Sequence, residues 1–246
     1  MSATFAEGGG VMTMQPPAAG SERPTALQHA LVLVEVYGLR IVRAHYPLFG
    51  GGCSCEQPDC DSIGKHPVVR GWPLTATSDQ VEVHRIFELH PRCNYGLLCG
   101  IAGGLIVLDI DGPEGFATLA AWEAQHGPLP PAPRVRTGRG EHRYFLATCP
   151  IKNTAGDRGR GLGPGLDVRG EGGFVIGPGS LHASGHFYGF IEGYRPAEVP
   201  QLHPLQPDML VVLADALPPP RAADEVPTQS YTRHAPREVR GQCAGA

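Results

Sequence analysis

The sequence predicts an α+β fold, because helical patterns come early in the chain and several strand patterns follow without a regular strand–helix alternation. The 34 glycines and 25 prolines among 246 residues argue against a helical bundle or a coiled coil, since both residue types interrupt long helices. Hydrophobic residues still make up 41 % of the chain, which is enough for a packed core. We expect one domain over 25–216, between disordered tails at 1–24 and 217–246.

The helices are expected where a capping residue or a proline suited to the first turn precedes an apolar pattern that a glycine or a proline ends. They lie between Thr25 and Gly38, between Ser78 and Leu89, over Glu114–Gln125 and near Asp208–Ala216. Strands are expected where short apolar or alternating runs are bounded by turn residues. These runs are Leu39–Tyr46, Leu97–Leu98, Leu105–Ile110, Val135–Thr137, Arg143–Ala147, Leu166–Arg169 and Phe174–Ile176.

Charge and hydropathy exclude several classes of protein. The net charge of −4 excludes a globally basic DNA-coating protein, although a basic region can still be concentrated locally. No apolar run reaches the roughly 18 residues of a membrane span, and Met1–Pro24 lacks the basic start and apolar stretch of a signal peptide. We therefore expect a cytoplasmic protein with no membrane partner.

Two carboxylates end the most apolar strand of the sequence, in the segment Leu105-Ile-Val-Leu-Asp-Ile-Asp-Gly112. Strand side chains alternate between faces, so Asp109 and Asp111 are expected on one face, away from the core. Two carboxylates this close repel each other unless a cation lies between them, and Mg²⁺ favours such oxygen ligands. The alternative is a pair of helix-capping aspartates. Phosphatases of the haloacid dehalogenase type also carry this pattern, but this chain has neither their paired aspartates nor a suitable downstream lysine.

A third carboxylate, Asp167, ends a second short strand between glycines. As a metal ligand it would complete a site of three acids with Asp109 and Asp111. As a salt-bridge partner of Arg169 it would have a purely structural role. The sequence favours neither interpretation.

A basic and glycine-rich segment surrounds this third acid. Between Arg134 and Gly170 the chain has three acidic residues and eight basic ones: Arg134, Arg136, Arg139, Arg143, Lys152, Arg158, Arg160 and Arg169. Arginines beside exposed backbone amides suit a triphosphate or a nucleic-acid backbone, whereas the alternative is a solvated basic loop. His142 lies within this segment, and Ser180 and His182 follow the next strand as two further donors on one face.

Cysteines and a histidine form a compact C-x-C-x₄-C-x₅-H pattern at Cys53, Cys55, Cys60 and His66. Three thiolates and one imidazole match tetrahedral structural Zn²⁺, and the surrounding segment 50–67 has few apolar residues with which to fold alone. The alternative is a set of free thiols. Cys93, Cys99 and Cys149 lie in apolar strand contexts and are expected in the core.

The order of motifs resembles the primase–polymerase domain of bifunctional DNA primase/polymerases, in the archaeo-eukaryotic primase superfamily, over about residues 27–195. The segments that carry the resemblance are Gly64-Lys-His-Pro67, Gly71-Trp-Pro73, Ala76-Thr-Ser-Asp79, Asn94-Tyr-Gly-Leu-Leu-Cys-Gly100, Leu108-Asp-Ile-Asp-Gly-Pro-Glu-Gly115, Gly140-Glu-His-Arg-Tyr-Phe145, Gly165-Leu-Asp-Val-Arg-Gly170 and Gly172-Gly-Phe-Val-Ile-Gly-Pro-Gly-Ser-Leu-His182. The ordered set is far more specific than any one motif.

The resemblance implies an RRM-like catalytic core with a mixed sheet that carries the acids, and an attached α/β unit. It implies that Asp109, Asp111 and Asp167 bind two Mg²⁺ or Mn²⁺ ions for template-dependent nucleotidyl transfer on single-stranded DNA with a primer and NTP or dNTP substrates. The residues it assigns to the nucleotide are Lys65, Arg139, His142, Arg169, Ser180 and His182. No P-loop pattern occurs in the chain, so a replicative helicase is expected only as a separate partner.

Two departures from the family pattern bear on these assignments. The family often has Gly-Gly-x-His where this chain has Gly140-Glu141-His142, and Glu141 would place a negative charge beside a phosphate site. Gly179 replaces a proline before Ser180 and changes mainly the stiffness of that loop. Two other functions use the same residues: a module that only binds nucleotide or single-stranded DNA, and a metal-dependent nuclease.

Overall fold

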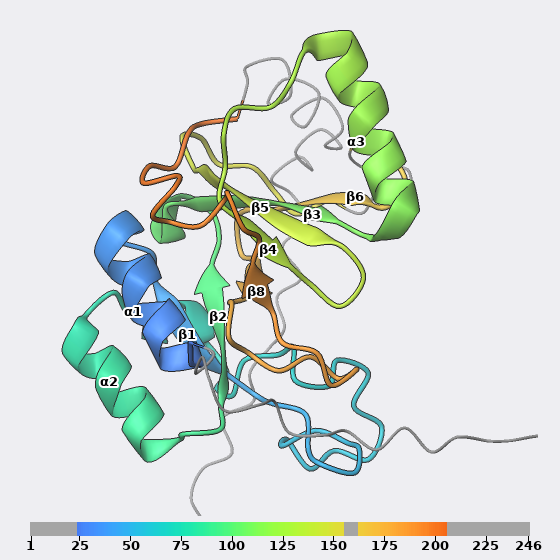
Figure 1. The fold of residues 1–246 in the computed structure, drawn as a ribbon. Helices are drawn as coiled ribbons and strands as arrows, with labels where there is room; N and C mark the ends of the chain where they lie inside the picture. Colours follow the sequence, from blue (N-terminus) through green and yellow to red (C-terminus); the bar gives the residue numbers. More distant parts are fainter. Residues whose placement is uncertain (1–23, 155–161, 206–246) are drawn as a thin grey trace, which may run out of the picture.

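The structure is a computed structural model that describes residues 24–154 and 162–205. It contains helices and two antiparallel sheets, so the predicted α+β class is correct. Figure 1 shows α1 and α2 beside the smaller sheet, and α3 along one face of the larger sheet. Among the described helices, none is long and apolar enough to cross a membrane.

The smaller sheet has three strands in the order β1-β2-β7, which are Ile41–Ala44, Asn94–Leu98 and Phe174–Ile176. Its core packs against α1 (Ala26–Tyr37) and α2 (Gln80–Leu89). Leu33, Phe87 and Tyr95 are among the buried side chains that join these layers.

The two helices beside this sheet begin and end as helix-capping chemistry requires. Thr25 accepts a hydrogen bond from the Gln28 amide and the Gln28 side chain returns one to Thr25, which completes a capping box. Gly38 ends the helix in the left-handed conformation at φ 66°. The second cap was predicted one residue early, because Asp79 and not Ser78 accepts the first amide hydrogen bonds of α2.

The larger sheet has five strands in the order β6-β3-β5-β4-β8, and every neighbouring pair is antiparallel. In chain order they are β3 Leu105–Ile110, β4 Arg134–Arg136, β5 Glu141–Leu146, β6 Leu166–Arg169 and β8 Gly189–Phe190. The expected mixed sheet is therefore wrong: a short turn reverses the chain between β4 and β5, and longer connections bring β5 and β6 antiparallel to the two sides of β3. The connection between β3 and β4 carries α3 (Gly112–His126).

Most predicted strands exist with shifted ends. The first is shorter than Leu39–Tyr46, and the one predicted at Arg143 begins at Glu141. Sequence patterns missed β8 and the 3₁₀ helices η1 (Trp72–Thr75) and η2 (Ile101–Gly103). The helix expected near 208–216 and the tails expected at 1–24 and 217–246 lie outside the described residues, apart from residue 24.

The two faces of the five-stranded sheet serve different purposes. On one face Leu108, Phe145 and Val168 pack with Trp122 of α3. On the other face the alternating residues, Val107 among them, join the core that covers the three-stranded sheet. Because side chains alternate along a strand, Asp109 shares this second face with Val107 and points between the two sheets.

Glu141 lies on the α3 side of the sheet, away from Asp109. It is buried, and its Oε1 accepts a 2.6 Å hydrogen bond from Nε of Arg143, whose Nη1 lies 3.6 Å from Glu123 of α3. The expectation that Glu141 adds negative charge beside a phosphate site is therefore wrong. Neighbours in a strand face opposite sides, and this carboxylate is neutralised on the side opposite His142.

Glu141→Ala is expected to lower the free energy of unfolding by about 3 kcal/mol, because it leaves the buried Arg143 without its closest counter-charge. The matched control is Glu82→Ala, which breaks an exposed glutamate–arginine pair of 3.2 Å and should cost less than about 1 kcal/mol. Urea denaturation of both variants measures the difference. Equal effects would show that the Arg143 pair contributes no more than a surface pair.

Candidate active site

The register of three strands aligns the predicted site residues across the sheet. Asp109 of β3 pairs directly with His142 of β5 on one side and with Asp167 of β6 on the other. Directly opposite side chains in antiparallel strands lie about 4.5–5.5 Å apart at Cβ. Three strands that are separated along the chain thus present one row of two acids and a histidine.

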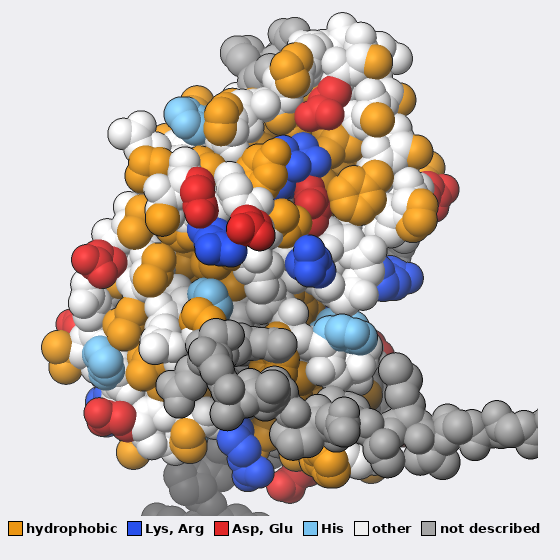
Figure 2. All heavy atoms as spheres, viewed as in Figure 1, with side chains coloured by type: hydrophobic (Ala, Val, Ile, Leu, Met, Phe, Trp, Pro, Cys, Tyr) orange, Lys and Arg blue, Asp and Glu red, His pale blue; other side chains and the backbone are white. Residues whose placement is uncertain are grey.

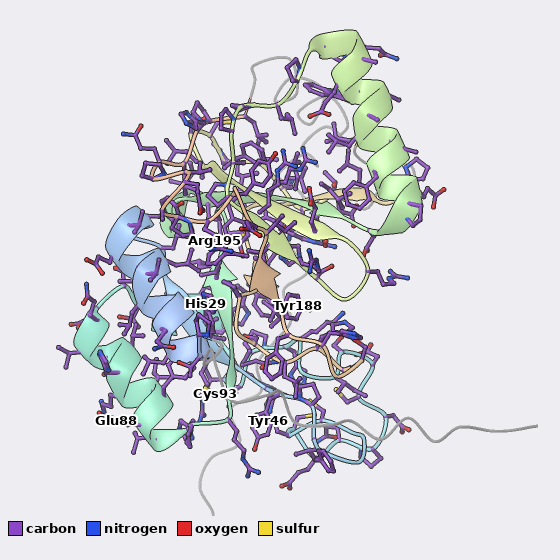
Figure 3. All side chains as sticks on the ribbon, in the orientation of Figure 1. His29, Tyr46, Glu88, Cys93, Tyr188 and Arg195 are labelled. Carbon is purple, nitrogen blue, oxygen red and sulfur yellow. The ribbon has the colours of Figure 1, made fainter. Side chains whose placement is uncertain are left out.

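A cavity of about 270 Å³ opens on this face, between the five-stranded sheet and β7 of the smaller sheet. Its lining residues are Lys65, Asp109, Asp111, Thr137, Gly138, Arg139, His142, Arg169, Phe174, Val175, Ile176, His182 and Tyr188. Figure 2 shows an indentation between the two halves of the molecule, with basic and histidine side chains at its border. Figure 3 places Tyr188 near β8, on the side of the large sheet that faces the loops below.

The structure brings most of the predicted site residues together, with two exceptions. Ser180 does not line the cavity: it is 1 % exposed, and its Oγ accepts a hydrogen bond from the Tyr95 amide. Its position in the fold is structural, because it fixes the turn after β7 to β2. Asp167 is not among the lining residues, but it meets Asp109 through Arg169.

Arg169 connects the two acids of the row. Its Nη2 lies 2.9 Å from Oδ2 of Asp109 and 3.1 Å from Oδ2 of Asp167, and its Nε lies 3.2 Å from the same Asp109 oxygen. The predicted ion pair between Asp167 and Arg169 is therefore present. It does not exclude the other interpretation of Asp167, because the same geometry places this acid opposite Asp109.

Asp111 begins α3 without capping it. Its backbone takes the N-cap position, but its side chain accepts no capping hydrogen bond, which argues against the helix-capping interpretation. Its Oδ1 lies 3.5 Å from Nη2 of Arg139, and about half of the side chain is exposed. Its amide donates to the Gly165 carbonyl at 2.8 Å, so the start of β6 is anchored beside the end of β3.

The surroundings of Asp109 favour its ionised form. Burial alone would raise the pKa of this carboxyl, but hydrogen bonding and charge from His142 and Arg169 outweigh burial and hold the pKa well below its usual value. Burial and the nearby charges of Asp109 and Asp111 raise the pKa of the Tyr188 hydroxyl above its usual value. The site therefore presents a carboxylate beside a neutral phenol across the physiological range of pH.

His142 has one engaged ring nitrogen and one unpaired ring nitrogen. Nε2 lies 3.4 Å from Oδ1 of Asp109, whereas the buried Nδ1 has no hydrogen-bond partner among the described residues. A buried unpaired nitrogen is costly unless a ligand satisfies it. The side chain is only 8 % exposed, and it lines the cavity beside Tyr188.

Glycines let two loops approach the site closely. A Cβ on Gly140 would lie 1.7 Å from the Ile110 carbonyl oxygen, so only glycine permits β5 to begin against the end of β3. A Cβ on Gly138 would lie 2.5 Å from the His182 ring. The glycines of this segment therefore shape one side of the cavity.

The basic segment does not form a single patch. Arg139 and Arg169 line the cavity, but Arg143 lies on the α3 side with Glu141, and Arg134 stacks on the ring of Tyr194 at 3.8 Å. Arg158 and Arg160 lie outside the described residues. Fewer positive side chains therefore lie near the acids than the number of basic residues in this segment of the sequence indicated.

The cavity also contains residues that sequence reasoning missed. Tyr188 comes from the segment before β8 and lies 6.1 Å from the His142 ring and 5.8 Å from the His182 ring, between centroids. Thr137 stands beside the glycine turn, and the apolar wall of β7 closes the opposite side. Of these residues only Thr137 could have been recognised from its neighbours in the sequence, since it precedes the turn Gly138-Arg139-Gly140.

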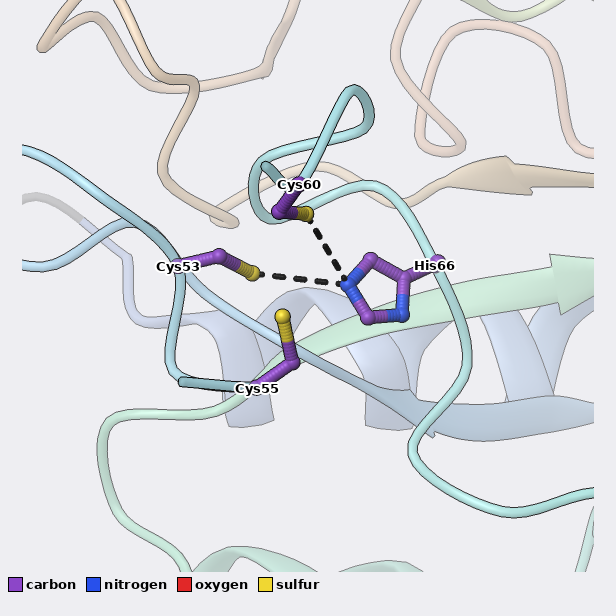
Figure 4. A group of neighbouring side chains, drawn as sticks. All are labelled: Cys53, Cys55, Cys60 and His66. Carbon is purple, nitrogen blue, oxygen red and sulfur yellow. Dashed lines mark hydrogen bonds between the residues drawn. The ribbon is translucent and has the colours of Figure 1, made fainter. Parts of the chain in front are cut away.

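The four predicted zinc ligands form a cluster in the loop that carries Lys65. The ligand atoms of Cys53, Cys55, Cys60 and His66 all lie within 4.8 Å of one another, and Figure 4 shows the three sulfur atoms around the imidazole. Nε2 of His66 is 3.4 Å from the Cys53 sulfur and 3.5 Å from the Cys60 sulfur. This Cys₃His group could bind a metal ion such as zinc.

The remaining cysteines divide as their sequence context indicated, with one exception. Cys93 and Cys99 are buried, and burial raises the pKa of both thiols. Cys149 is only half-buried, at the edge of the cluster on the α3 side.

Within the Cys₃His group, burial opposes ionisation of Cys53, but hydrogen bonds from the Gly64 amide and from Cys55 and His66 lower the pKa of this thiol to about 7.

Comparison with known families agrees with this geometry. The sequence pattern of the family described as bifunctional DNA primase/polymerase, N-terminal, matches residues 38–202, which include both sheets, the acids and the cysteine cluster. A search among curated proteins finds no match. Because the matched segment covers well over half of the sequence, the chain belongs to the bifunctional DNA primase/polymerase N-terminal family.

Proposed function

We propose that the protein joins nucleotides to a 3′-hydroxyl on a single-stranded DNA template, as a DNA primase or polymerase. Family membership indicates nucleotidyl transfer of the primase–polymerase type in general. The observation that supports the finer proposal is the row of Asp167, Asp109 and His142 across three strands. Asp109 and His142 of this row line one cavity with Asp111 and Arg169. We also propose that the five-stranded sheet and α3 correspond to the RRM-like core of this superfamily.

The acids suit two Mg²⁺ or Mn²⁺ ions, which Asp109, Asp111 and Asp167 would hold. Carboxylate oxygens are the ligands that these hard cations prefer. Arg169 already places a positive group between two of the acids, which supports a cation at this position. When bound, the ions would activate the attacking 3′-hydroxyl and stabilise the pyrophosphate leaving group.

The basic lining of the cavity suits a nucleoside triphosphate. Lys65 enters from the cysteine loop, Arg139 from the β4–β5 turn and His182 from the segment after β7. Burial, with the charges of Lys65, His186 and Arg139, lowers the pKa of His182. Lys65 and Arg139 would therefore supply more of the positive charge than His182, and the His142 and His182 rings would orient phosphate oxygens.

We propose that the Cys₃His group holds structural Zn²⁺. Tetrahedral zinc, with bonds of about 2.3 Å to sulfur and 2.0–2.1 Å to nitrogen, places sulfur and nitrogen about 3.5 Å apart. The measured separations of 3.4 and 3.5 Å from His66 to two sulfurs match this value. The ion would fix the loop that carries Lys65 to the cavity.

Template-directed incorporation tests the proposed function. The protein is incubated with Mn²⁺, labelled dNTPs or NTPs, and a single-stranded template either with or without a primer. We expect products whose added nucleotides complement the template. Shortened labelled strands would support the nuclease instead, and retained nucleotide or DNA binding without any product would support a binding module. Addition of a helicase from the same replicon would test for a separate helicase partner.

A further inference from the structure

A positive side chain occupies the position between the two aligned acids. Nη2 of Arg169 is within hydrogen-bond distance of both Asp109 and Asp167, and its Nε contacts the same Asp109 oxygen. The side chains of the two acids are only 15 % and 18 % exposed. Two such carboxylates need a counter-charge, because water solvates them poorly and they face each other across β3 and β6.

The guanidinium also has access to the space that a ligand would fill. Arg169 is one of the cavity-lining residues, and 31 % of its side chain is exposed. Lys65 and Arg139 line the same cavity, so an anionic ligand there would meet several positive groups. A guanidinium binds phosphate oxygens as well as carboxylate oxygens through its planar set of donors.

We propose that Arg169 is an exchangeable counter-ion of the metal centre. In the nucleotide-free protein its guanidinium neutralises Asp109 and Asp167, and it transfers to the triphosphate when metal and nucleotide bind together. This inference rests on the proposed function and adds a positioning role to Arg169. The exchange keeps every charge paired, because the carboxylates gain the metal ion as the guanidinium gains the phosphates.

The exchange predicts coupling between the two ligands. A divalent ion alone must displace Arg169 from Asp109 and Asp167 and leave the guanidinium without an anionic partner. A triphosphate removes that cost, so each ligand strengthens binding of the other by the same factor. If Arg169 is absent, the acids are open to the metal ion and the triphosphate no longer lowers the cost of displacement.

Titration with Mn²⁺, followed by electron paramagnetic resonance of the unbound ion, tests this proposal. It is performed on the full chain with and without a non-hydrolysable deoxynucleoside triphosphate, and corrected for Mn²⁺ bound to nucleotide in solution. We expect Arg169→Gln to bind Mn²⁺ alone about tenfold more tightly than wild type, because charge-assisted hydrogen bonds to both acids are removed. The enhancement of Mn²⁺ binding by the triphosphate should shrink by a similar factor.

Arg136→Gln is the matched control, because it removes the same charge from an exposed position of β4 that does not line the cavity. Solvent screens this exposed side chain, so the affinity for Mn²⁺ alone should change by no more than about threefold. Thermal melting supplies a second readout that does not depend on a binding isotherm. Metal-free Arg169→Gln should melt at a lower temperature than wild type, and added Mn²⁺ should raise its melting temperature by more than that of wild type.

Two results would overturn the proposal, and they differ in what else they overturn. Unchanged or weaker Mn²⁺ binding by Arg169→Gln, with binding that still depends on Asp109, would make Arg169 a fixed group that orients the acids, and the proposed function would stand. Binding of Mn²⁺ that Asp109→Asn leaves unaffected would refute the metal centre itself, and with it both the exchange and the proposed function. Arg169→Lys keeps the positive charge but not the planar set of guanidinium donors. Its affinity for Mn²⁺ should therefore lie between those of wild type and Arg169→Gln.

Discussion

Asp109→Asn is expected to reduce template-directed nucleotide incorporation by about a thousandfold or more. The substitution preserves shape but removes the charge of the central acid, which pairs with both His142 and Asp167. Stabilisation of developing charge by a metal ion is worth several kcal/mol, and each 1.36 kcal/mol corresponds to a factor of ten in rate. Single-turnover primer extension with Mn²⁺ measures the loss.

Glu114→Gln is the matched control for this substitution. Glu114 is an exposed acid in the first turn of α3, close in sequence to Asp111, but it is not among the residues that line the cavity. Its neutralisation should change the rate by less than about threefold. Comparable losses in both variants, or near-normal incorporation by a folded Asp109→Asn protein, would contradict the assignment of Asp109.

Cys55→Ser is expected to lower the melting temperature by roughly 10 °C, and chelation of the wild-type protein should have a similar effect. Structural zinc contributes its binding free energy directly to folding, and about 3 kcal/mol corresponds to roughly 10 °C in a protein of this size. The variant should also bind nucleotide more weakly, since the loop that carries Lys65 would lose its anchor.

Cys149→Ser provides the comparison for the cysteine cluster. This cysteine is also half-buried but lies outside the Cys₃His group. The melting temperature of the Cys149→Ser protein should therefore stay within a few degrees of that of wild type. Metal analysis of the purified protein should give about one zinc per chain in wild type and Cys149→Ser, and much less in Cys55→Ser. Zinc-free wild-type protein with an unchanged melting temperature would refute the structural role of the cluster.

The sequence identified the acids because their signal is local. A buried apolar run, two alternating aspartates and a glycine before a helix can be recognised within eight residues. The pairing of Asp109 with His142 and Asp167 is not local, since it depends on the register of β3 against β5 and β6. Resemblance to a family supplied that grouping, and the strand pairing gives its physical basis.

Two errors of the sequence analysis share one cause, and the misplaced Ser180 has another. Glu141 was placed beside the phosphates because it precedes His142, but adjacent strand residues face opposite sides of the sheet. The same alternation carries Arg143 to the α3 side, so a count of charge along the segment overstated the charge of the cavity. Ser180 and His182 were expected together, but the turn after β7 buries the serine against the Tyr95 amide.

Other features had no local signal at all. Tyr188 reaches the cavity because the short strand β8 adds to β4 at the sheet edge, and nothing in a two-residue strand predicts that pairing. The antiparallel order of the large sheet likewise depends on how β6 returns beside β3. Long-range pairing of this kind is set by packing of the whole core, which a single sequence does not reveal.

The most direct test of the central claim is the anomalous diffraction signal of Mn²⁺ in crystals of the wild-type protein grown with a non-hydrolysable deoxynucleoside triphosphate. We expect Mn²⁺ peaks bounded by Asp109, Asp111 and Asp167, with the triphosphate against Arg139 and His142 and with Arg169 turned toward it. Mn²⁺ and triphosphate bound elsewhere, with the cavity acids still held by Arg169, would contradict the claim that these carboxylates form the catalytic centre.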